Sequence, residues 1–323
     1  MKLVRSNERP NFEGLVSRRN DTHVLTGFLH HPVIADAFYE LSRTGARIHL
    51  QSESVDVHGI KGIMRLVRDR VKAGRHMRHI SGVLAIGTSG VRYFERLGFE
   101  RGCIIPFGYF VAAKGGLEAP SDARGAPPQF RIAFAGQLIR RKGLDILFDA
   151  LGRVRDLGWS LDLIGSGPLM DSLKRLATEI GITDRIAWQG PVAPEHIHGR
   201  IAGADLFVLP SRWDGWGVVV NESLAAGVPV VCSDRCGASC VLKSPGIGEI
   251  FPAGDVDALG SILRRRISAG RLAQESRVGC RAAAAALTPE AGARHFLDGL
   301  AAIEAAAMPP PPPWMRHLSP LPS

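Results

Sequence analysis

The sequence has no long hydrophobic run and few cysteines. Nowhere in its 323 residues does an apolar stretch approach the roughly 18 residues that span a membrane. Residues 1–18 also lack the apolar segment of a signal peptide. Cysteine occurs only five times, an odd number that does not suit a disulfide framework in a chain of this size. These absences predict a cytoplasmic protein.

The composition that remains is that of an ordinary globular protein. Hydrophobic residues make up 45% of the chain and charged residues 22%, and the length suggests about two domains. The formal net charge of +9 favours anionic partners, which include phosphates, nucleic acids and lipid surfaces. The charge alone does not choose among these classes.

A segment rich in glycine, proline and alanine divides the chain. This segment, residues 112–129, predicts an interdomain linker. Residues 1–111 before it predict a short N-terminal domain, and residues 130–305 after it predict a Rossmann-like domain. The last residues, 306–323, contain five consecutive prolines and predict a disordered tail.

The predicted fold class is α/β. Strands are expected at 23–28, 46–54, 82–90, 103–110, 130–135, 161–165, 185–190, 205–210 and 228–232. Between them lie segments with the apolar spacing of amphipathic helices. Strands that alternate with helices favour a parallel sheet that is covered on both faces.

Two carboxylates interrupt an apolar, glycine-rich stretch at residues 211–231. Asp214 and Glu222 have seven residues between them. The pattern predicts a loop, a helix near 218–226 and then a strand, which puts the loop at the ligand-binding edge of a doubly wound sheet. The two acids would lie very roughly 10 Å apart, at ~1.5 Å per helical residue. That separation suits two acceptors for hydroxyls of one long ligand, and the helix start suits a phosphate. The alternative is that Asp214 caps the helix and Glu222 is solvated.

The stretch SRWDGWGVVVNESLAAGVPVV resembles the Glu-x7-Glu signature of retaining glycosyltransferases of family 4, which have the GT-B fold. The resemblance runs from about Phe130 to Glu304, and more weakly from about Thr22 to Tyr109. Further landmarks follow in the order of the family: IIPFGYF, FAGQLIRRKG, LDLIGSGP, WQGPV, DLFVLPSRWDGWG and an SD-x-x-G turn. The resemblance implies two Rossmann-like domains facing a cleft, with a nucleotide sugar bound mainly by the second domain.

The same resemblance implies roles for individual residues. Lys142 would neutralise the diphosphate, Asp214 would contact hydroxyls of the donor sugar, and Glu222 would accept hydrogen bonds from the ribose. His30 would lie near the sugar, although a histidine next to another at a strand end is also typical of a plain surface residue. Donor contacts are implied for Gly136, Arg141, Lys142, Gly165, Gly167, Gln189, Trp216, Gly217 and Glu222.

The implied reaction is the transfer of a hexose-type sugar from a nucleotide diphosphate sugar to a glycan or lipid-linked glycan, with retention of configuration. Its main task is to stabilise the leaving diphosphate, which Lys142 with Arg140 or Arg141 would do. No metal and no cofactor are implied, because the nucleotide sugar is the substrate. The alternatives are a nucleotide-sugar-binding protein without transferase activity and, third, a fold-mate such as a sugar-nucleotide epimerase.

The sequence departs from the pattern of the family at three points. The first acid is Asp214 rather than glutamate, and Gln137 stands where many members have arginine. Residues 1–111 are short for a Rossmann domain of this type, and the opening strand and its Gly-rich turn are not recognisable. We therefore interpret the chain start as truncated or the protein as impaired, and expect donor binding with slow turnover.

Two short patterns resemble metal sites. Asp255 and Asp257 form a D-x-D pattern, but they precede an apolar helical pattern, which predicts a helix N-cap. Cys232, Cys236 and Cys240 are four residues apart and lack an obvious fourth ligand, so we do not predict a metal there. A third pattern, GSGPLM, lacks the third glycine of a dinucleotide-binding loop, so we do not expect dinucleotide binding.

Residues 61–80 carry seven basic residues and one acid. This helical segment could dock on an anionic bilayer, which would give the protein a peripheral position on the cytoplasmic membrane face. The interpretation that we favour is an ordinary helix with a solvated basic face, whose apolar residues Ile63, Leu66, Val67 and Val71 serve the core. Nucleic-acid binding is not expected, since no motif accompanies the charge.

Overall fold

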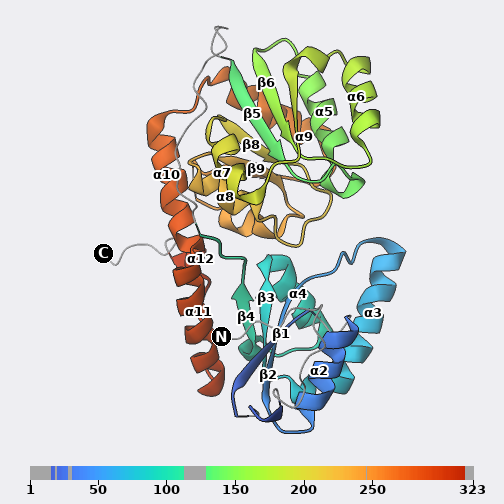
Figure 1. Ribbon diagram of the computed structural model, residues 1–323, viewed down its shortest axis with the longest axis vertical. Coiled ribbons are helices and arrows are strands. Elements are labelled where there is room, and N and C mark those ends of the chain that lie inside the picture. The colour runs from blue at the N-terminus through green and yellow to red at the C-terminus, as the bar shows by residue number, and fades with distance from the viewer. Residues whose placement is uncertain (1–15, 19, 28–30, 113–128, 245, 317–323) are drawn as a thin grey trace. The chain divides into compact units, whose positions relative to one another are not determined.

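The computed structural model describes residues 16–18, 20–27, 31–112, 129–244 and 246–316, and these form two compact units (Figure 1). Unit 1 comprises Met1–Gly108 and Ala293–Pro312, and unit 2 comprises Tyr109–Gly292 and Pro313–Ser323. Each unit is built on a parallel sheet with helices between its strands. This confirms the predicted α/β class with two Rossmann-like parts.

Unit 1 contains a parallel sheet with the strand order β1-β2-β3-β4. Its strands are β1 (Thr22–Thr26), β2 (Arg47–Glu53), β3 (Gly82–Ile86) and β4 (Ile104–Phe107), and its connecting helices are α2 (Pro32–Ser42), α3 (Gly59–His76) and α4 (Gly87–Leu97). The strands follow each other in chain order, so right-handed crossovers put all three helices on one face. Phe38, Ile48 and Phe94 are completely buried in the resulting core.

Unit 2 contains a six-stranded parallel sheet with the order β10-β9-β8-β5-β6-β7. Its strands are β5 (Phe130–Ala135), β6 (Trp159–Ile164), β7 (Ile186–Gly190), β8 (Leu206–Leu209), β9 (Val230–Ser233) and β10 (Gly248–Phe251). The central strand β8 (LFVL) is apolar and buried throughout, as expected for a strand that is covered on both faces. The short strand β10, with a glutamate in its middle, was not predicted.

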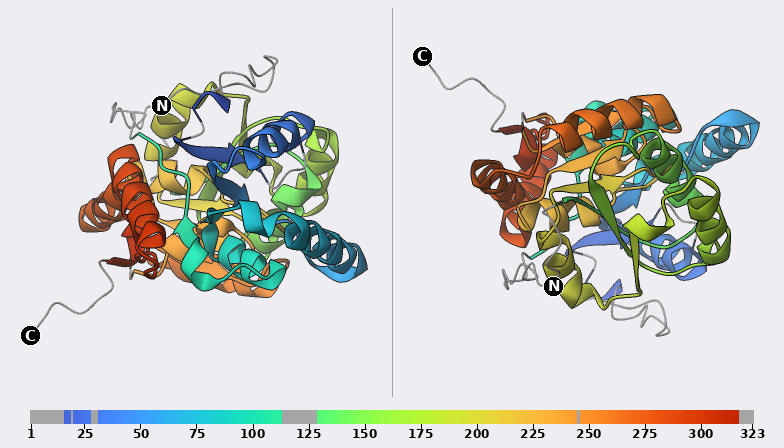
Figure 2. Two further views of the ribbon diagram at one scale, coloured as in Figure 1. Left: turned by 90° about the horizontal axis from the view of Figure 1, so that it is seen from below. Right: turned by 90° about the horizontal axis from the view of Figure 1, so that it is seen from above.

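The helices of unit 2 cover both faces of its sheet (Figure 2). They are α5 (Leu144–Gly152), α6 (Met170–Glu179), α7 (Pro194–Ala202), α8 (Val219–Ala225), α9 (Val256–Ser268) and α10 (Gln274–Ala284). Helix α5 packs against α6 and α9, whereas α8 packs against α7 and α10. The loop between β8 and α8 follows the carboxyl end of β8, so it lies at the carboxyl edge of the sheet, as predicted.

The predicted end of the second domain at residue 305 differs from the observed division. Helix α11 (Pro289–Glu304) belongs to unit 1 from Ala293 onward. The buried His295 Nε2 lies 2.8 Å from the carbonyl oxygen of Pro106, and the bare backbone of Gly299 lets the helix approach Ile105. No local pattern in the sequence indicates the sheet on which this helix packs.

The prediction of a disordered tail is wrong for the residues up to Arg316. Helix α12 (Pro313–Arg316) follows the proline run, and Trp314 is buried in unit 2. The Trp314 ring lies 5.4 Å from that of Trp216 and 6.1 Å from that of Phe110, measured between centroids. One large aromatic side chain thus anchors a segment whose composition suggested no packing. Residues 317–323 and most of the predicted linker, 113–128, lie outside the described residues.

Helix α3 also differs from the interpretation that we favoured. Ile63, Val67 and Val71 are more than half exposed, and only Leu66 of the four apolar residues packs on the core. The face that does turn inward carries Gly62, Asp69 and Ala73. The apolar stripe therefore points to solvent instead of serving the core. Among the described residues, no helix is both long enough and apolar enough to cross a membrane.

Candidate functional site

The candidate site lies at the point where the strand order of the unit 2 sheet reverses. Strands β5 and β8 are neighbours, but the chain leaves β5 towards β6 and leaves β8 towards β9. The loops after β5 and β8 consequently diverge to opposite sides of the sheet at its carboxyl edge. Such switch points form the crevice in which open α/β sheets bind ligands.

Close backbone packing explains the glycines of this edge. A Cβ atom at Gly165 would lie 1.9 Å from the carbonyl oxygen of Gly136, so the loops after β5 and β6 could not approach each other with a larger residue there. A Cβ atom at Gly167 would lie 2.6 Å from the carbonyl oxygen of Leu138. Gly165 and Gly167, two of the predicted donor-site glycines, are therefore required by the loop packing itself, whatever else they contact.

Lys142 and Asp214 meet directly at the switch point. Lys142 follows β5 and Asp214 follows β8, and Lys142 Nζ lies 2.5 Å from Asp214 Oδ2. Gly143 is essential to this approach: its φ is 68°, and a Cβ atom there would lie 2.2 Å from the carbonyl oxygen of Pro210. Both charged side chains are largely buried. Two residues that the sequence analysis assigned separately, to the diphosphate and to the sugar, thus form one ion pair.

Two arginines join the same two loops. Arg141 Nη1 donates to the carbonyl oxygen of Trp213 and lies 3.6 Å from Asp214 Oδ1. Arg212 donates both guanidinium nitrogens to the carboxylate of Asp145 at 2.7 and 2.6 Å. Burial alone would raise the pKa of Asp145, but the hydrogen bonds and charge of Arg212 lower it overall. The edge thus carries three cationic side chains held by two carboxylates.

The acidic loop is held by Trp216 and its neighbours. The Trp216 indole donates to the side-chain oxygen of Asn221 at 2.9 Å, and the Asn221 amide donates to the carbonyl oxygen of Tyr109 at 2.7 Å. The N-cap of α8 is Val218, without a side-chain cap. The alternative in which Asp214 caps this helix is therefore wrong, because the Asp214 carboxylate contacts Lys142 and Arg141 instead.

Three supporting residues of this loop were missed by the sequence analysis. Asn221 is buried beside Glu222, Tyr109 contacts the Trp216 ring edge-on, and Trp314 packs on the same ring. The only signal in the sequence was the position of Asn221 within the motif. Tyr109 and Trp314 are far from the loop in sequence, so no local pattern indicates them.

The turn after β9 supports the acidic loop from the other side. Gly237 N donates to the carbonyl oxygen of Asp214, and Ala238 N donates to that of Trp216. The Cys236 thiol donates to the same Trp216 carbonyl at 2.9 Å. A hydrogen bond with Cys236 and burial raise the pKa of the Cys232 thiol. Both cysteines are buried, and they pack beneath the loop.

The remaining predicted residues have different surroundings. Glu222 lies on α8 and is partly buried, and Gly217 has a φ of 92° at the end of the acidic loop. Gln189 lies on β7, where its amide donates to Asp162 on β6 at 3.1 Å, so it also links two strands. His30 lies outside the described residues. Donor contacts of all these residues stay predictions.

The D-x-D pattern is part of a helix start. The Asp255 side chain accepts a hydrogen bond from the backbone of Ala258 and caps α9, which confirms the predicted N-cap. Asp257 forms an ion pair with Arg153 on the surface. Within the described ranges, no group of three or more histidines, cysteines, aspartates or glutamates is arranged to hold a metal ion.

Comparisons with known proteins agree with this architecture. A family model described as glycosyl transferases group 1 matches residues 122–284. The GDP-mannose-dependent alpha-(1-6)-phosphatidylinositol monomannoside mannosyltransferase of Mycobacterium tuberculosis is 33% identical over 135 residues, which is 39% of this chain and 35% of that protein. The lipopolysaccharide 1,6-galactosyltransferase of Salmonella typhimurium is 30% identical over 156 residues, 46% of this chain and 42% of that protein. The chain thus spans well under half the length of these relatives.

Solved structures extend the likeness to the fold of both units. The lipopolysaccharide outer core galactosyltransferase WaaB has a TM-score of 0.70 at 19% identity, covering 90% of this chain and 77% of that one. Anabaena HepE, solved with UDP and glucose, has a TM-score of 0.67 at 17% identity, covering 90% of this chain and 81% of that one. These structures support the fold, and the matching family model covers half of the sequence. The chain belongs to the glycosyl transferases group 1 family, within the GT-B glycosyltransferase superfamily.

Proposed function

We propose that the chain is a retaining glycosyltransferase of family 4. It transfers a hexose-type sugar from a nucleotide diphosphate sugar to a glycan or lipid-linked glycan acceptor. The observation that carries the proposal is the pairing of Lys142 with Asp214 at the switch point of the unit 2 sheet. The relatives are named as transferases, so a binding protein without activity is not favoured.

The cations of the switch point suit a diphosphate. Lys142 and Arg141 both reach Asp214 from the loop after β5, and Arg212 lies in the loop after β8. A dianionic group that enters this edge gains several positive charges at once. An ammonium beside a leaving diphosphate stabilises the negative charge that develops on it, which is the largest barrier-lowering effect available to such a reaction. Transfer then needs no base beyond the departing phosphate itself to accept the proton of the acceptor hydroxyl.

The two acids suit the neutral parts of the donor. Asp214 pairs with Lys142, so a diphosphate bound by Lys142 would bring the donor sugar near the Asp214 carboxylate, which would accept hydrogen bonds from the sugar hydroxyls. Glu222 lies on α8, the helix that follows the loop of Asp214. It is partly buried and suits the ribose hydroxyls. Carboxylates accept hydrogen bonds from hydroxyls more strongly than neutral groups do. Gly136, Gly165, Gly167, Gln189, Trp216 and Gly217 complete the proposed donor site, and His30 is proposed near the sugar.

Donor binding is tested first by a thermal-shift panel of UDP, GDP, ADP and their sugars. A ligand at 100 times its dissociation constant should stabilise the chain by roughly 2.7 kcal/mol. The absence of a shift with every common nucleoside diphosphate at millimolar concentration contradicts the proposal. The panel also identifies the base of the preferred nucleotide.

Matched variants assign the binding to this site. Glu222→Ala should weaken binding by ~1.5–3 kcal/mol, because a charged acceptor is lost, and Lys142→Ala should weaken it by a similar amount. The controls Glu275→Ala and Lys243→Ala remove exposed side chains of the same types elsewhere in unit 2 and should leave affinity unchanged. Equal affinities for Glu222→Ala and Glu275→Ala would show that Glu222 makes no ribose contact.

Turnover is tested with the bound donor and a pool of acceptors, with and without EDTA. We expect transfer that resists chelation, since the proposed charge stabilisation comes from Lys142 and its neighbouring arginines. Complete loss of transfer on chelation, restored by manganese or magnesium, would contradict the metal-independent scheme. Donor binding without transfer to any acceptor would instead favour a binding function.

A further inference from the structure

Helix α3 of unit 1 has a fixed inner face that determines which side chains point outward. Asp69 is completely buried and accepts a hydrogen bond from the Tyr93 hydroxyl at 2.7 Å. Gly62 packs so closely that a Cβ atom there would lie 2.2 Å from the carbonyl carbon of Val57. These two contacts, nearly two turns apart, set the rotation of the helix about its axis.

The outer face of α3 is apolar. Its members are spaced so that they share one stripe, and each is between 52% and 79% exposed: Ile60, Ile63, Met64, Val67 and Val71. The 18-residue helix is about 27 Å long, so the stripe follows more than half of it. Isolated exposed apolar side chains are common, but five large ones in one row on a single helix mark an interaction surface.

Cations border this stripe. Lys61, Arg68 and Arg75 are seven residues apart and follow one edge of it, and Arg70 lies on the other edge. The only acid in the helix is Asp69, which is buried on the inner face. The outer face of α3 therefore combines apolar side chains with positive charge and presents no carboxylate of its own.

We propose that the apolar stripe of α3 docks on the surface of an anionic lipid bilayer. A helix of this kind lies in the interfacial plane, with apolar side chains among the acyl chains and cations at the headgroups. A second copy of the chain suits this face less well. An isologous pair would bring the same basic edges together without an acid between them. The inference does not depend on the proposed transfer reaction.

Vesicle flotation of the whole chain, without nucleotide or acceptor, tests the proposal. We expect binding to vesicles that contain phosphatidylglycerol, little binding to pure phosphatidylcholine vesicles, and weaker binding as salt rises. No flotation with phosphatidylglycerol vesicles overturns the proposal. Because donor binding plays no part in this measurement, its failure and the failure of the proposed function are distinguishable.

Two variants separate the apolar and the charged contributions. The triple change Ile63→Ser, Met64→Ser and Val67→Ser should weaken partitioning by at least about tenfold, since it removes apolar area from the bilayer. Lys61→Gln with Arg75→Gln should weaken it about 30-fold, from roughly fivefold per cation. Arg68 is left in place because it also contacts the buried Asp69.

The matched control is Val278→Ser with Leu297→Ser, which removes two equally exposed apolar side chains from other helices. This control should float like the unchanged chain, and all variants should keep its melting temperature. A serine triple variant that floats as well as the control overturns the proposal. Sedimentation velocity without lipid adds a second criterion: if the triple change converts a dimer to a monomer, the stripe belongs to a second copy.

Discussion

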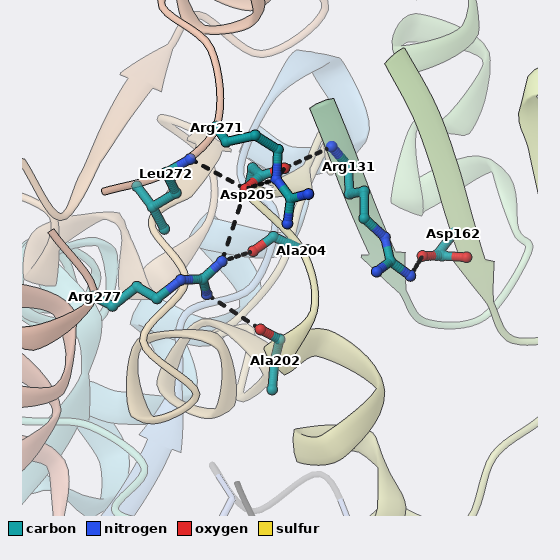
Figure 3. Close-up of polar contacts among 8 residues, drawn as sticks. All are labelled: Arg131, Asp162, Ala202, Ala204, Asp205, Arg271, Leu272 and Arg277. Carbon is teal, nitrogen blue, oxygen red and sulfur yellow. Dashed lines mark hydrogen bonds and ion pairs between the residues drawn. The ribbon is translucent and has the colours of Figure 1, made fainter. Parts of the chain in front are cut away.

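Two buried aspartates at opposite ends of strand β8 hold cations in different ways. Asp205 lies just before the strand, and its carboxylate accepts hydrogen bonds from the backbone N–H groups of Arg131 and Leu272 at 2.9 and 3.1 Å (Figure 3). Arg271 and Arg277 complete its surroundings at 3.0 and 3.8 Å. Asp214 lies after the strand, and the partners described for its carboxylate are side chains: Lys142, Arg141 and Ser211.

The two carboxylates differ in whether a bound ligand could replace their partners. The Asp205 carboxylate is completely buried and joined to two backbone groups, so it cannot lose its partners unless the sheet and the segment before α10 separate. The cationic partners of Asp214, Lys142 and Arg141, are long side chains from the loop after β5, which can turn towards a phosphate while the backbone stays in place. Similar ion-pair chemistry therefore supports stability at the amino edge and leaves charge available for binding at the carboxyl edge.

The largest expected effect is on stability, from Asp205→Ala. The change should cost about 3–5 kcal/mol, because it leaves two arginines without their buried carboxylate and two backbone N–H groups without an acceptor. Urea unfolding followed by tryptophan fluorescence measures it, and all five tryptophans lie in unit 2. The exposed Asp184→Ala is the control and should stay within about 0.5 kcal/mol. A loss below about 1 kcal/mol for Asp205→Ala would show that water replaces the carboxylate.

A buried titratable group in unit 1 should give a smaller, pH-dependent effect. Burial, with a further contribution from Arg47, lowers the pKa of His49 to about 4 from its ordinary value of 6.5. Its Nδ1 atom has no hydrogen-bond partner within the described part of the chain. Between pH 6.5 and 4 the unfolded chain binds a proton that the folded chain does not. Stability is thus complete above pH 6.5 and falls by up to about 3 kcal/mol towards pH 4, at ~1.36 kcal/mol per unit.

Hydrogen exchange of β2 and β3 across this pH range measures the effect in unit 1. His49→Leu should remove most of the pH dependence, whereas His31→Gln, at an exposed position, should keep it. The difference between each variant and the unchanged chain separates the histidine from carboxylates that titrate nearby. Parallel slopes for His49→Leu and the unchanged chain would show that His49 already meets solvent.

Asp214→Ala tests the carboxylate whose partners a ligand could replace. We expect a cost of about 1–2 kcal/mol by the same fluorescence measurement, less than for Asp205→Ala, since the partners described for the Asp214 carboxylate are side chains and Arg141 among them reaches solvent. Donor binding should weaken at the same time. A stability loss equal to that of Asp205→Ala would mean that both pairs are purely structural.

Double-mutant cycles sharpen the same point. The coupling free energy between Lys142 and Asp214 should decrease when a saturating nucleoside diphosphate is present, because the ammonium is then shared with the phosphates. The coupling between Arg271 and Asp205 should be the same with and without the nucleotide. If the nucleotide changed both coupling free energies equally, the two edges of the sheet would not differ in their availability for binding.

The smallest effects should come from the D-x-D acids of α9. Asp255→Ala removes the N-cap and should cost about 1 kcal/mol. Asp257→Ala removes an ion pair whose two side chains are largely exposed, and should change stability by no more than about 0.5 kcal/mol. Neither change should alter transfer or its response to EDTA. Loss of activity in either variant would revive a metal-binding interpretation.

Several parts of the fold could be predicted because they depend on local pattern. Residues 130–135 form β5 as expected, since a strand buried on both faces is almost entirely apolar, with Arg131 as the one charged residue here. The helix after the acidic loop ends before Gly227, which has a φ of 77° as a helix stop requires. The carboxylate spacing in residues 214–222 identified the loop that lies at the carboxyl edge of the sheet.

Other features could not be predicted because their contacts join distant parts of the chain. The pairing of Lys142 with Asp214 joins residues 72 positions apart, and it follows from the neighbouring positions of β5 and β8. Trp314 lies in a proline-rich segment whose composition suggested disorder, yet it packs on Trp216. An apolar side chain in a sequence pattern does not reveal whether it faces a core or solvent, which is why the outward stripe of α3 was assigned to the core.

The sequence by itself determined the parallel α/β class, the glycine loops and the acids of the candidate site, because these depend on residue type and spacing along one short segment. The tertiary structure alone decided which charges neutralise one another, with Lys142 on Asp214 and the arginines on Asp205. It also decided that α11 packs on the first sheet from Ala293 onward. The physical reason is that the strand order of the unit 2 sheet departs from chain order and that α11 packs on a strand formed much earlier in the chain. The energies of burial and ion pairing are therefore set by neighbours that the linear sequence keeps far apart.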